Sequence, residues 1–348
     1  MRRAKTDACD SILISGSFRF FGLFLLFCLL GILARPANAQ DTSRVGTSVI
    51  APPRPDFTFT FARVDTFDLK LDLYLPRGFR ADSSGRIVAV DSASKARDTS
   101  RVPFVLWLHG GGWRGGTRAD PCPALPLRDS GFAVVSADYR LSTQANWPAQ
   151  IHDAKAALRW LRAHADSLHL DTARAVAWGT SAGGQLAALL GLTSPADGLE
   201  GRVGVDSGVV PPARVRAVVM YHAPTDFLEY HPRRWKSGSS ISQLLGCPAP
   251  ECPVRARQAS PAAYATTDDP PVLVVHGSID STVPVTQAWR MYAALRAADV
   301  PAELAILPNA EHGGPDFVSP DMMARVSAFL ARAFSVDGDS SSAAFAPR

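Results

Sequence analysis

The sequence of 348 residues predicts an α/β fold: a mostly parallel, mixed sheet flanked by helices on both faces, preceded by antiparallel strands. Short runs of consecutive apolar residues suit strands that are buried on both faces. Six such runs occur, at residues 104–108, 132–137, 175–178, 215–221, 271–276 and 302–307. Segments with helical spacing of apolar residues lie at 149–165, 185–192, 285–298 and 321–334. This alternation of strand and helix is typical of a sheet covered by helices.

The predicted antiparallel strands come first in the chain. Residues 57–63 and 66–75 alternate apolar and polar side chains, so that Phe67, Leu69 and Leu71 share one face. A period of two indicates half-buried strands, and we expect these two to pair in antiparallel fashion. Residues 80–101 are rich in Ser, Asp, Ala and Arg and are predicted to form a surface excursion, whose apolar patch IVAV suits an added hairpin.

Composition predicts a globular protein of one large domain, or at most two. Hydrophobic residues make up 47% of the chain and charged residues 20%, which suits a protein with a sizeable core. We expect the domain to span 57–334, after a flexible lead-in over 40–56 and before a disordered tail over 335–348. Residues 222–270 interrupt the alternation of strand and helix, and long insertions of this kind are often binding loops or lids.

The first 39 residues are predicted to be a signal peptide. A basic N-terminus precedes an apolar run at 20–34, which is bounded by Arg19 and Arg35. The run is shorter than the roughly 20 residues that span a bilayer. The small-x-small sequence that ends at Ala39 is typical of a signal-peptidase site. We expect cleavage after Ala39 and export to the periplasm or the exterior; an uncleaved membrane anchor is the alternative.

Removing that segment leaves little net charge. The full chain carries a net charge of +4, and residues 1–39 hold five basic against two acidic side chains, so the remainder is near +1. A protein that binds nucleic acid presents a clustered basic face. The sequence gives no indication of one, and no partner of that class is expected.

The stretch Gly179-Thr180-Ser181-Ala182-Gly183 matches the pattern G-x-S-x-G. The pattern is informative only between a strand and a helix, where a sharp turn projects the serine hydroxyl above the sheet. Here the apolar run 175–178 precedes it and a helical pattern follows. The setting favours Ser181 as a nucleophile; a turn of small residues that merely allows close packing is the alternative.

A second motif, His109-Gly110-Gly111-Gly112-Trp113, directly follows the predicted strand 104–108. Acyl transfer develops a negative charge on oxygen, and backbone N–H groups aimed at that oxygen stabilise it. Consecutive glycines leave such N–H groups unobstructed. In esterases and lipases with a loop of this type, the residue after the serine supplies a further N–H. We therefore expect Gly111, Gly112 and Ala182 to donate to the oxyanion.

A serine hydroxyl is a weak nucleophile until a base takes its proton, and histidine is the usual base near neutral pH. His312 lies directly after the last predicted strand and before the last helix, where the chain order serine, acid, histidine requires it. His109 and His276 end strands and are expected to be buried. Three further histidines lie on or near a predicted helix and are expected at the surface: His152, His164 and His169.

The carboxylate that orients the base is predicted to be Asp280. It lies in the loop that follows the strand 271–276, in the sequence HGSIDSTVP. Asp226, after the preceding strand, is the rival. All the proposed groups then emerge at the carboxyl ends of strands, where open α/β sheets bind ligands.

Three cysteines remain after the expected cleavage: Cys122, Cys247 and Cys252. Cys247 and Cys252 are close enough in sequence to close a short loop through a disulfide, which would persist in an oxidising compartment. Two free thiols are the alternative. A zinc site is disfavoured because no matching Cys or His pair lies nearby.

Taken together, these motifs resemble the α/β-hydrolase superfamily. More narrowly, they are similar to the esterase branch of hormone-sensitive-lipase-like carboxylesterases and bacterial feruloyl or acetyl-xylan esterase-like proteins. The resemblance covers about residues 57–334. It rests on the stretches HGGGW, DYRL followed by WPA, GTSAGG, HGSIDSTVP and EHGG. Within the insertion it also rests on LLGC and on Ala259-Ser260-Pro261.

The resemblance implies hydrolysis of carboxylic esters, with short acyl groups or with polysaccharide-linked groups, by Ser181, His312 and Asp280. It implies no metal and no organic cofactor. Trp113, Phe227 and Trp235 are candidates for contact with the substrate. Three other functions stay open: a secreted serine peptidase of the same fold, a non-catalytic hydrolase-like binding protein, and an arylformamidase, which export disfavours.

Overall fold

The computed structural model describes residues 53–83, 87–90, 101–206, 208–230 and 236–335. Every described residue belongs to one compact unit, Ala51–Arg348. The predicted signal peptide, most of the lead-in, Trp235 and residues 336–348 lie outside the described residues. Ser335, which was assigned to the tail, is instead the last residue of helix α7, where its hydroxyl donates to the carbonyl oxygen of Arg332 at 3.0 Å.

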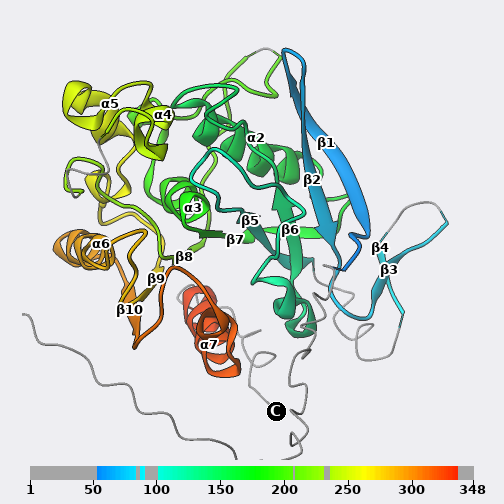
Figure 1. The fold of residues 1–348 in the computed structure, drawn as a ribbon. Helices are drawn as coiled ribbons and strands as arrows, with labels where there is room; N and C mark the ends of the chain where they lie inside the picture. Colours follow the sequence, from blue (N-terminus) through cyan, green and yellow to red (C-terminus); the bar gives the residue numbers. More distant parts are fainter. Residues whose placement is uncertain (1–52, 84–86, 91–100, 207, 231–235, 336–348) are drawn as a thin grey trace, which may run out of the picture. The chain divides into compact units, whose positions relative to one another are not determined.

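An eight-stranded sheet forms the centre of the described unit, in the order β1-β2-β6-β5-β7-β8-β9-β10 (Figure 1). The six strands from β6 to β10 in this order run parallel, and β2 is antiparallel to both of its neighbours. Its strands are β1 (Phe57–Val64), β2 (Phe67–Tyr74), β5 (Val102–Leu108), β6 (Ala133–Ala137), β7 (Leu170–Thr180), β8 (Ala217–Tyr221), β9 (Val272–Gly277) and β10 (Ala302–Leu307). The predicted mixed sheet with leading antiparallel strands is confirmed.

The central strands are buried on both faces, as their unbroken apolar sequences indicate. All residues of β5, β6, β8 and β9 are buried. Strand β7 begins earlier than the apolar run at 175–178 suggested. Its polar start still pairs with β5, since Leu170 lies opposite Val102 before the register shifts. The first residues of β7 are mostly polar and do not form an apolar run. The predicted strand therefore began too late in the sequence.

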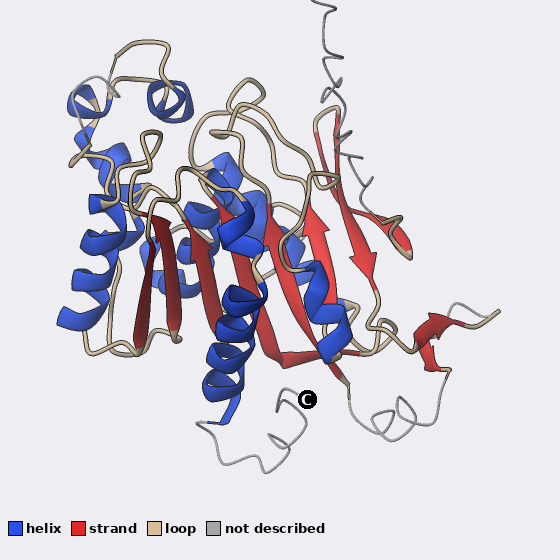
Figure 2. Cartoon of the chain, turned by 60° about the horizontal axis from the view of Figure 1, so that its bottom comes forward, coloured by secondary structure: helices blue, strands red, loops and turns tan. Residues whose placement is uncertain are grey.

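Helices cover both faces of the sheet (Figure 2). Leucines and alanines of α2, α3 and α6 join one core, together with Leu106, Ala177 and Val274 from the strands. Helix α7 and the short 3₁₀ helix η1 (Leu125–Ser130) pack on the other face. The long helices are α2 (Ala149–Ala163), α3 (Ala182–Leu192), α6 (Thr286–Ala297) and α7 (Pro320–Ser335). Alternate residues of each strand thus enter different cores.

Two further parts lie outside this alternation. The hairpin β3 (Phe79–Ala81) and β4 (Ile87–Ala89) forms a separate antiparallel sheet at the predicted apolar patch. The insertion after β8 contains α4 (Ser240–Leu245) and α5 (Pro253–Gln258). Among the described helices, none is both long enough and apolar enough to cross a membrane.

Candidate active site

Ser181 occupies the single residue between strand β7 and helix α3. Its backbone has φ 53° and ψ −117°, a conformation that costs free energy for a residue with a side chain. The turn is held from both sides. The Ser181 N–H donates to the carbonyl oxygen of Tyr221 on β8 at 2.9 Å, and the first turn of α3 closes when Gln185 N–H donates to the Ser181 carbonyl oxygen at 3.2 Å.

Small residues around Ser181 allow this turn to approach the neighbouring backbone. A Cβ atom on Gly183 would overlap the carbonyl oxygens of Leu108 and His109, at the end of β5. A Cβ atom on Gly179 would overlap the carbonyl group of Gly183. The glycines of the G-x-S-x-G stretch are therefore required for close packing, and that packing brings the serine next to the loop after β5.

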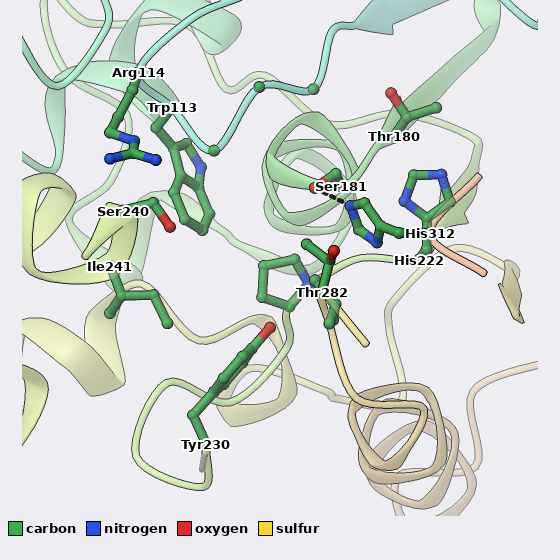
Figure 3. A pocket seen from close by; sticks show the side chains of 15 residues that line it. Trp113, Arg114, Thr180, Ser181, His222, Tyr230, Ser240, Ile241, Thr282 and His312 are labelled. Atoms are coloured by element: carbon green, nitrogen blue, oxygen red, sulfur yellow. Dashed lines mark hydrogen bonds between the residues drawn. The ribbon is translucent and has the colours of Figure 1, made fainter. Parts of the chain in front are cut away.

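Three side chains from three loops form one hydrogen-bonded chain. His312, between β10 and α7, has Nε2 at 2.9 Å from Ser181 Oγ (Figure 3) and Nδ1 at 2.7 Å from Asp280 Oδ2. A neutral imidazole that donates its Nδ1–H to Asp280 leaves Nε2 free to accept the serine proton. The structure thus brings together the three residues that sequence reasoning selected, and it uses Asp280 rather than Asp226.

Asp280 is buried and fully engaged. Its Oδ1 accepts the backbone N–H groups of Thr282 and Val283, each at 2.8 Å, and its Oδ2 also lies 3.2 Å from His276 Nε2. Burial alone would raise the pKa of Asp280, but the hydrogen bonds from His276 and His312 outweigh burial and hold it well below its usual range. The carboxylate is therefore ionised at neutral pH, as an orienting acid must be.

Asp226 lies elsewhere. Its carboxylate accepts the N–H of Leu228 at 3.1 Å and is 3.9 Å from the guanidinium of Arg290. It closes a local turn after β8. His276, which was expected to be a satisfied core residue, donates through Nε2 towards both Val283 and Asp280, so it helps to hold the acid.

The glycine loop after β5 lies beside Ser181. Gly111 and Gly112 have φ of 100° and 60°, a region that favours glycine. The loop is closed by the N–H groups of Arg114 and Gly115, which both donate to the Gly111 carbonyl oxygen. Within the described residues, no hydrogen bond uses the N–H of Gly111, Gly112 or Ala182. Those three N–H groups thus have no hydrogen-bond acceptor within the described part of the chain.

Trp113 continues this loop and forms part of the cavity wall. Its backbone has φ 57°, and its indole N–H donates to the buried Gln185 side chain at 3.1 Å. Gln185 in turn donates to the carbonyl oxygen of Ala259 at 2.7 Å. One amide on helix α3 therefore connects the glycine loop to the insertion. Sequence reasoning missed Gln185; its only signal is a polar residue one turn after Ser181 on an otherwise apolar helix.

Phe227, predicted as a possible substrate contact, does not line the cavity. Its side chain is fully buried and packs edge-on against Trp113, with ring centroids 5.5 Å apart. Trp113 lies between the Phe227 ring and the cavity. The sequence pattern does not indicate which of the two aromatic rings faces the cavity. Phe227 supports Trp113 from below.

A cavity of about 450 Å³ opens at Ser181 and His312. Figure 3 shows Trp113 and Arg114 on one side of it and His312 on the other. The insertion contributes Tyr230, Ser240 and Ile241 to the wall. Volumes of this order are typical of pockets for small ligands.

His222 also lines this cavity and was not predicted. Its ring lies 4.3 Å from that of His312, at a steep angle, and its backbone has φ 39°. Burial, with the charge of His312 as a second cause, lowers the pKa of His222 to about 3. His222 is therefore neutral near pH 7 and adds no charge beside the His312 ring.

The remaining predicted residues have structural surroundings. The sulfur atoms of Cys247 and Cys252 are bonded at 2.00 Å, so the structure contains the disulfide, and Cys122 is a buried free thiol. His109 is buried and stacks on Tyr139. In the described part of the chain, no group of three or more His, Cys, Asp or Glu side chains is arranged to hold a metal ion.

The chain is similar to known esterases. Esterase LipC of Mycobacterium tuberculosis is 33% identical over 226 residues, which are 63% of this chain and 55% of LipC. A truncated carbohydrate esterase from gut microbiota has a TM-score of 0.66 at 24% identity, over 80% of this chain and 96% of that one. Thermogutta terrifontis esterase 2 phosphorylated by paraoxon has a TM-score of 0.60 at 23% identity, over 79% of this chain and 93% of that one.

At this identity the two solved structures show the fold, and the chain spans about half the length of the relatives of the LipC type. The model of the BD-FAE family matches residues 90–295, which contain the glycine loop, the turn at Ser181, the insertion and Asp280. The strand order, the serine turn between β7 and α3 and this match agree, and the chain therefore belongs to the BD-FAE family, with the α/β-hydrolase fold.

Proposed function

We propose that this protein is an exported serine carboxylesterase that hydrolyses carboxylic esters through Ser181, His312 and Asp280. The observation that carries the proposal is the chain of hydrogen bonds from Ser181 Oγ to His312 Nε2 and from His312 Nδ1 to Asp280, beside three unused backbone donors. Relatives and structural neighbours that are named as esterases support the reaction type.

In the first half of the reaction, Ser181 Oγ attacks the acyl carbon while His312 Nε2 takes the hydroxyl proton. The carbonyl oxygen becomes an oxyanion and accepts hydrogen bonds from the N–H groups of Gly111, Gly112 and Ala182. Each such donor is worth about 3 kcal/mol in the transition state. When the tetrahedral intermediate collapses, the alcohol leaves with the proton from His312, and the acyl group stays on Ser181.

In the second half, water attacks the acyl-enzyme while His312 takes one of its protons. The same oxyanion site stabilises the second tetrahedral intermediate. Collapse releases the carboxylic acid and returns the proton to Ser181 Oγ. Throughout, ionised Asp280 stabilises the imidazolium form of His312 and fixes its orientation.

The size of the cavity supports small substrates or the ester-bearing end of a larger one. A volume of about 450 Å³ accommodates a short acyl chain together with part of the alcohol. We therefore propose short-chain acyl esters, including those carried by plant-type polysaccharides, as the substrate class.

The test compares wild-type protein with Ser181→Ala on p-nitrophenyl acetate. Turnover by the wild type should fall by more than about 10⁴-fold in the variant. The matched control is Ser167→Ala, which removes an exposed hydroxyl at the end of the α2 region and should retain wild-type rates. Turnover retained by Ser181→Ala would overturn the proposal.

Two outcomes would favour the other functions. Cleavage of peptide p-nitroanilides without ester hydrolysis would favour a peptidase, and binding of esters without turnover would favour a non-catalytic protein. Export is tested separately, by N-terminal sequencing of the protein recovered outside the cytoplasm. A mature chain that begins at Gln40 is expected, and one that begins before Arg35 would contradict cleavage.

A further inference from the structure

One permanently charged side chain lies on the cavity wall. Of the fifteen residues that line the cavity within the described part of the chain, Arg114 is the only Lys, Arg, Asp or Glu. The remaining wall is made of glycines, aromatic and aliphatic groups, hydroxyls and two histidines. A guanidinium stays charged at every relevant pH. Among the described residues, Arg114 alone therefore gives the cavity a fixed positive charge.

Arg114 is held to the glycine loop through its backbone, while its side chain remains free. Its N–H donates to the Gly111 carbonyl oxygen at 3.1 Å. Its guanidinium is exposed and has no ion pair or hydrogen bond among the described residues. Arg118, four residues later, differs: it pairs with Asp72 and Asp138 at 3.1 and 2.8 Å. The neighbouring arginine is used in the fold, and Arg114 is available to a ligand.

Two acidic groups that lie near wall residues in the sequence, Asp280 and Glu229, face other partners. Asp280 is buried behind His312 and accepts hydrogen bonds on both oxygens. Glu229, the neighbour of Tyr230, pairs with Arg290 at 2.9 Å. The charge of Arg114 is thus not neutralised by either of them.

Arg114 lies on the wall of the same cavity as Ser181 and His312. Figure 3 shows its guanidinium beside Trp113 and above Ser240, across the cavity from His312. Ser240 is adjacent to Gly112, since a Cβ atom on that glycine would lie 3.3 Å from the Ser240 Cβ. A planar guanidinium binds carboxylates in a bidentate manner, and the neighbouring hydroxyl can donate a further hydrogen bond.

We propose that Arg114 is a specificity residue that binds a carboxylate on the substrate, so that the preferred substrates are anionic esters. The inference rests on the proposed esterase function and deepens it. The carboxylate has two possible sources, the acyl part or the alcohol part of the ester. Both use the same chemistry, and the experiment separates them.

The experiment measures kcat/KM for two pairs of esters that differ in charge and little in size. For the acyl part, the pair is p-nitrophenyl hemiglutarate and p-nitrophenyl pentanoate. For the alcohol part, the pair is 3-acetoxypropionate and butyl acetate. Hydrolysis of this pair is followed by titrating the acetic acid that is released. The variants are Arg114→Gln and Arg114→Lys. The matched control is Arg296→Gln, which removes an exposed arginine of α6 that does not line the cavity.

In one of the two pairs, Arg114→Gln should lower the ratio of anionic to neutral kcat/KM by about tenfold, which corresponds to roughly 1.4 kcal/mol. Arg114→Lys should retain part of the preference, and added salt should weaken it in the wild type. The pair that responds identifies the part of the ester that carries the carboxylate. Arg296→Gln should leave both ratios unchanged.

Three results would overturn the inference. If neither ratio changes in Arg114→Gln while neutral esters are hydrolysed, Arg114 is not a specificity residue and the esterase function stands. An equal change in Arg296→Gln would show that the effect reflects net charge. If the wild type hydrolyses none of the four esters, the proposed function itself fails, and the inference fails with it.

Discussion

Gln185 connects three parts of the site, and replacing it tests whether that connection positions the glycine loop. Its side chain is fully buried, accepts the indole N–H of Trp113 and donates to the carbonyl oxygen of Ala259. The substitution Gln185→Met keeps a side chain of similar length and removes both hydrogen bonds. The indole N–H and the Ala259 carbonyl group then lose their partners in a buried environment.

The cost follows from these two groups. Each buried polar group left without a partner costs about 1–3 kcal/mol. Burial of the apolar Met side chain offsets part of the cost of the two groups, so we expect the free energy of unfolding to fall by about 3 kcal/mol. For a domain of this size, each kcal/mol lowers Tm by roughly 2–4 °C, which gives about 6–12 °C. Because Trp113 follows Gly112 directly, kcat should also fall, by about tenfold or more, as the oxyanion donors shift.

The assay combines thermal unfolding, steady-state kinetics on p-nitrophenyl acetate and a double-mutant cycle with Trp113→Phe. Once the indole N–H is absent, Gln185→Met should cost about 1–2 kcal/mol less than it does in the wild type. The control is Gln144→Met, at an exposed position. Strict additivity in the cycle, or an unchanged Tm and kcat in Gln185→Met, would refute the reasoning.

Three further predictions concern the acid, pH and the disulfide. Asp280→Asn should lower kcat by about 10⁴-fold, whereas Asp226→Asn should change it little, because its carboxylate closes a local turn; the reverse ranking in steady-state kinetics would reassign the acid. His222, with its pKa lowered to about 3, stays neutral in the folded protein while the unfolded chain takes up a proton below about pH 6.5. The free energy of unfolding, measured with denaturant, should therefore fall as the pH drops from about 6.5 towards 3, by up to about 1.4 kcal/mol per pH unit. His222→Asn should make this dependence on pH less steep, and equal slopes in the two proteins would contradict the prediction. Replacing Cys247 and Cys252 with serine should cost about 2 kcal/mol in the free energy of unfolding, the entropy expected for so short a loop, and an unchanged denaturation midpoint would show that the loop is held by other contacts.

The sheet and the three residues of the hydrogen-bonded chain are predictable from the sequence for one physical reason. Parallel strands that are buried on both faces consist of consecutive apolar residues, and their carboxyl ends meet at one edge of the sheet. Ser181, Asp280 and His312 each follow such a run directly. Their mutual distance is then a consequence of topology, which the order of strands and helices already indicates.

Contacts that depend on packing within loops could not be predicted in this way. The insertion after β8 has no periodicity, so nothing in its sequence indicated that Tyr230 and Ile241 line the cavity while Phe227 lies beneath Trp113. The contact of His222 with His312 joins residues from two loops. Each of these contacts depends on how a loop folds over the sheet. The sequence of a loop has no periodicity from which its conformation could be predicted.

The central claim, that Ser181 is the nucleophile, is tested most directly by covalent labelling. Paraoxon transfers a diethylphosphoryl group to an activated serine, and mass spectrometry of the peptides then identifies the labelled residue. We predict stoichiometric modification of Ser181, loss of esterase activity in proportion to labelling, and no modification of that peptide in Ser181→Ala. Labelling of a different residue such as Ser240, or full activity in protein labelled at Ser181, would contradict the claim.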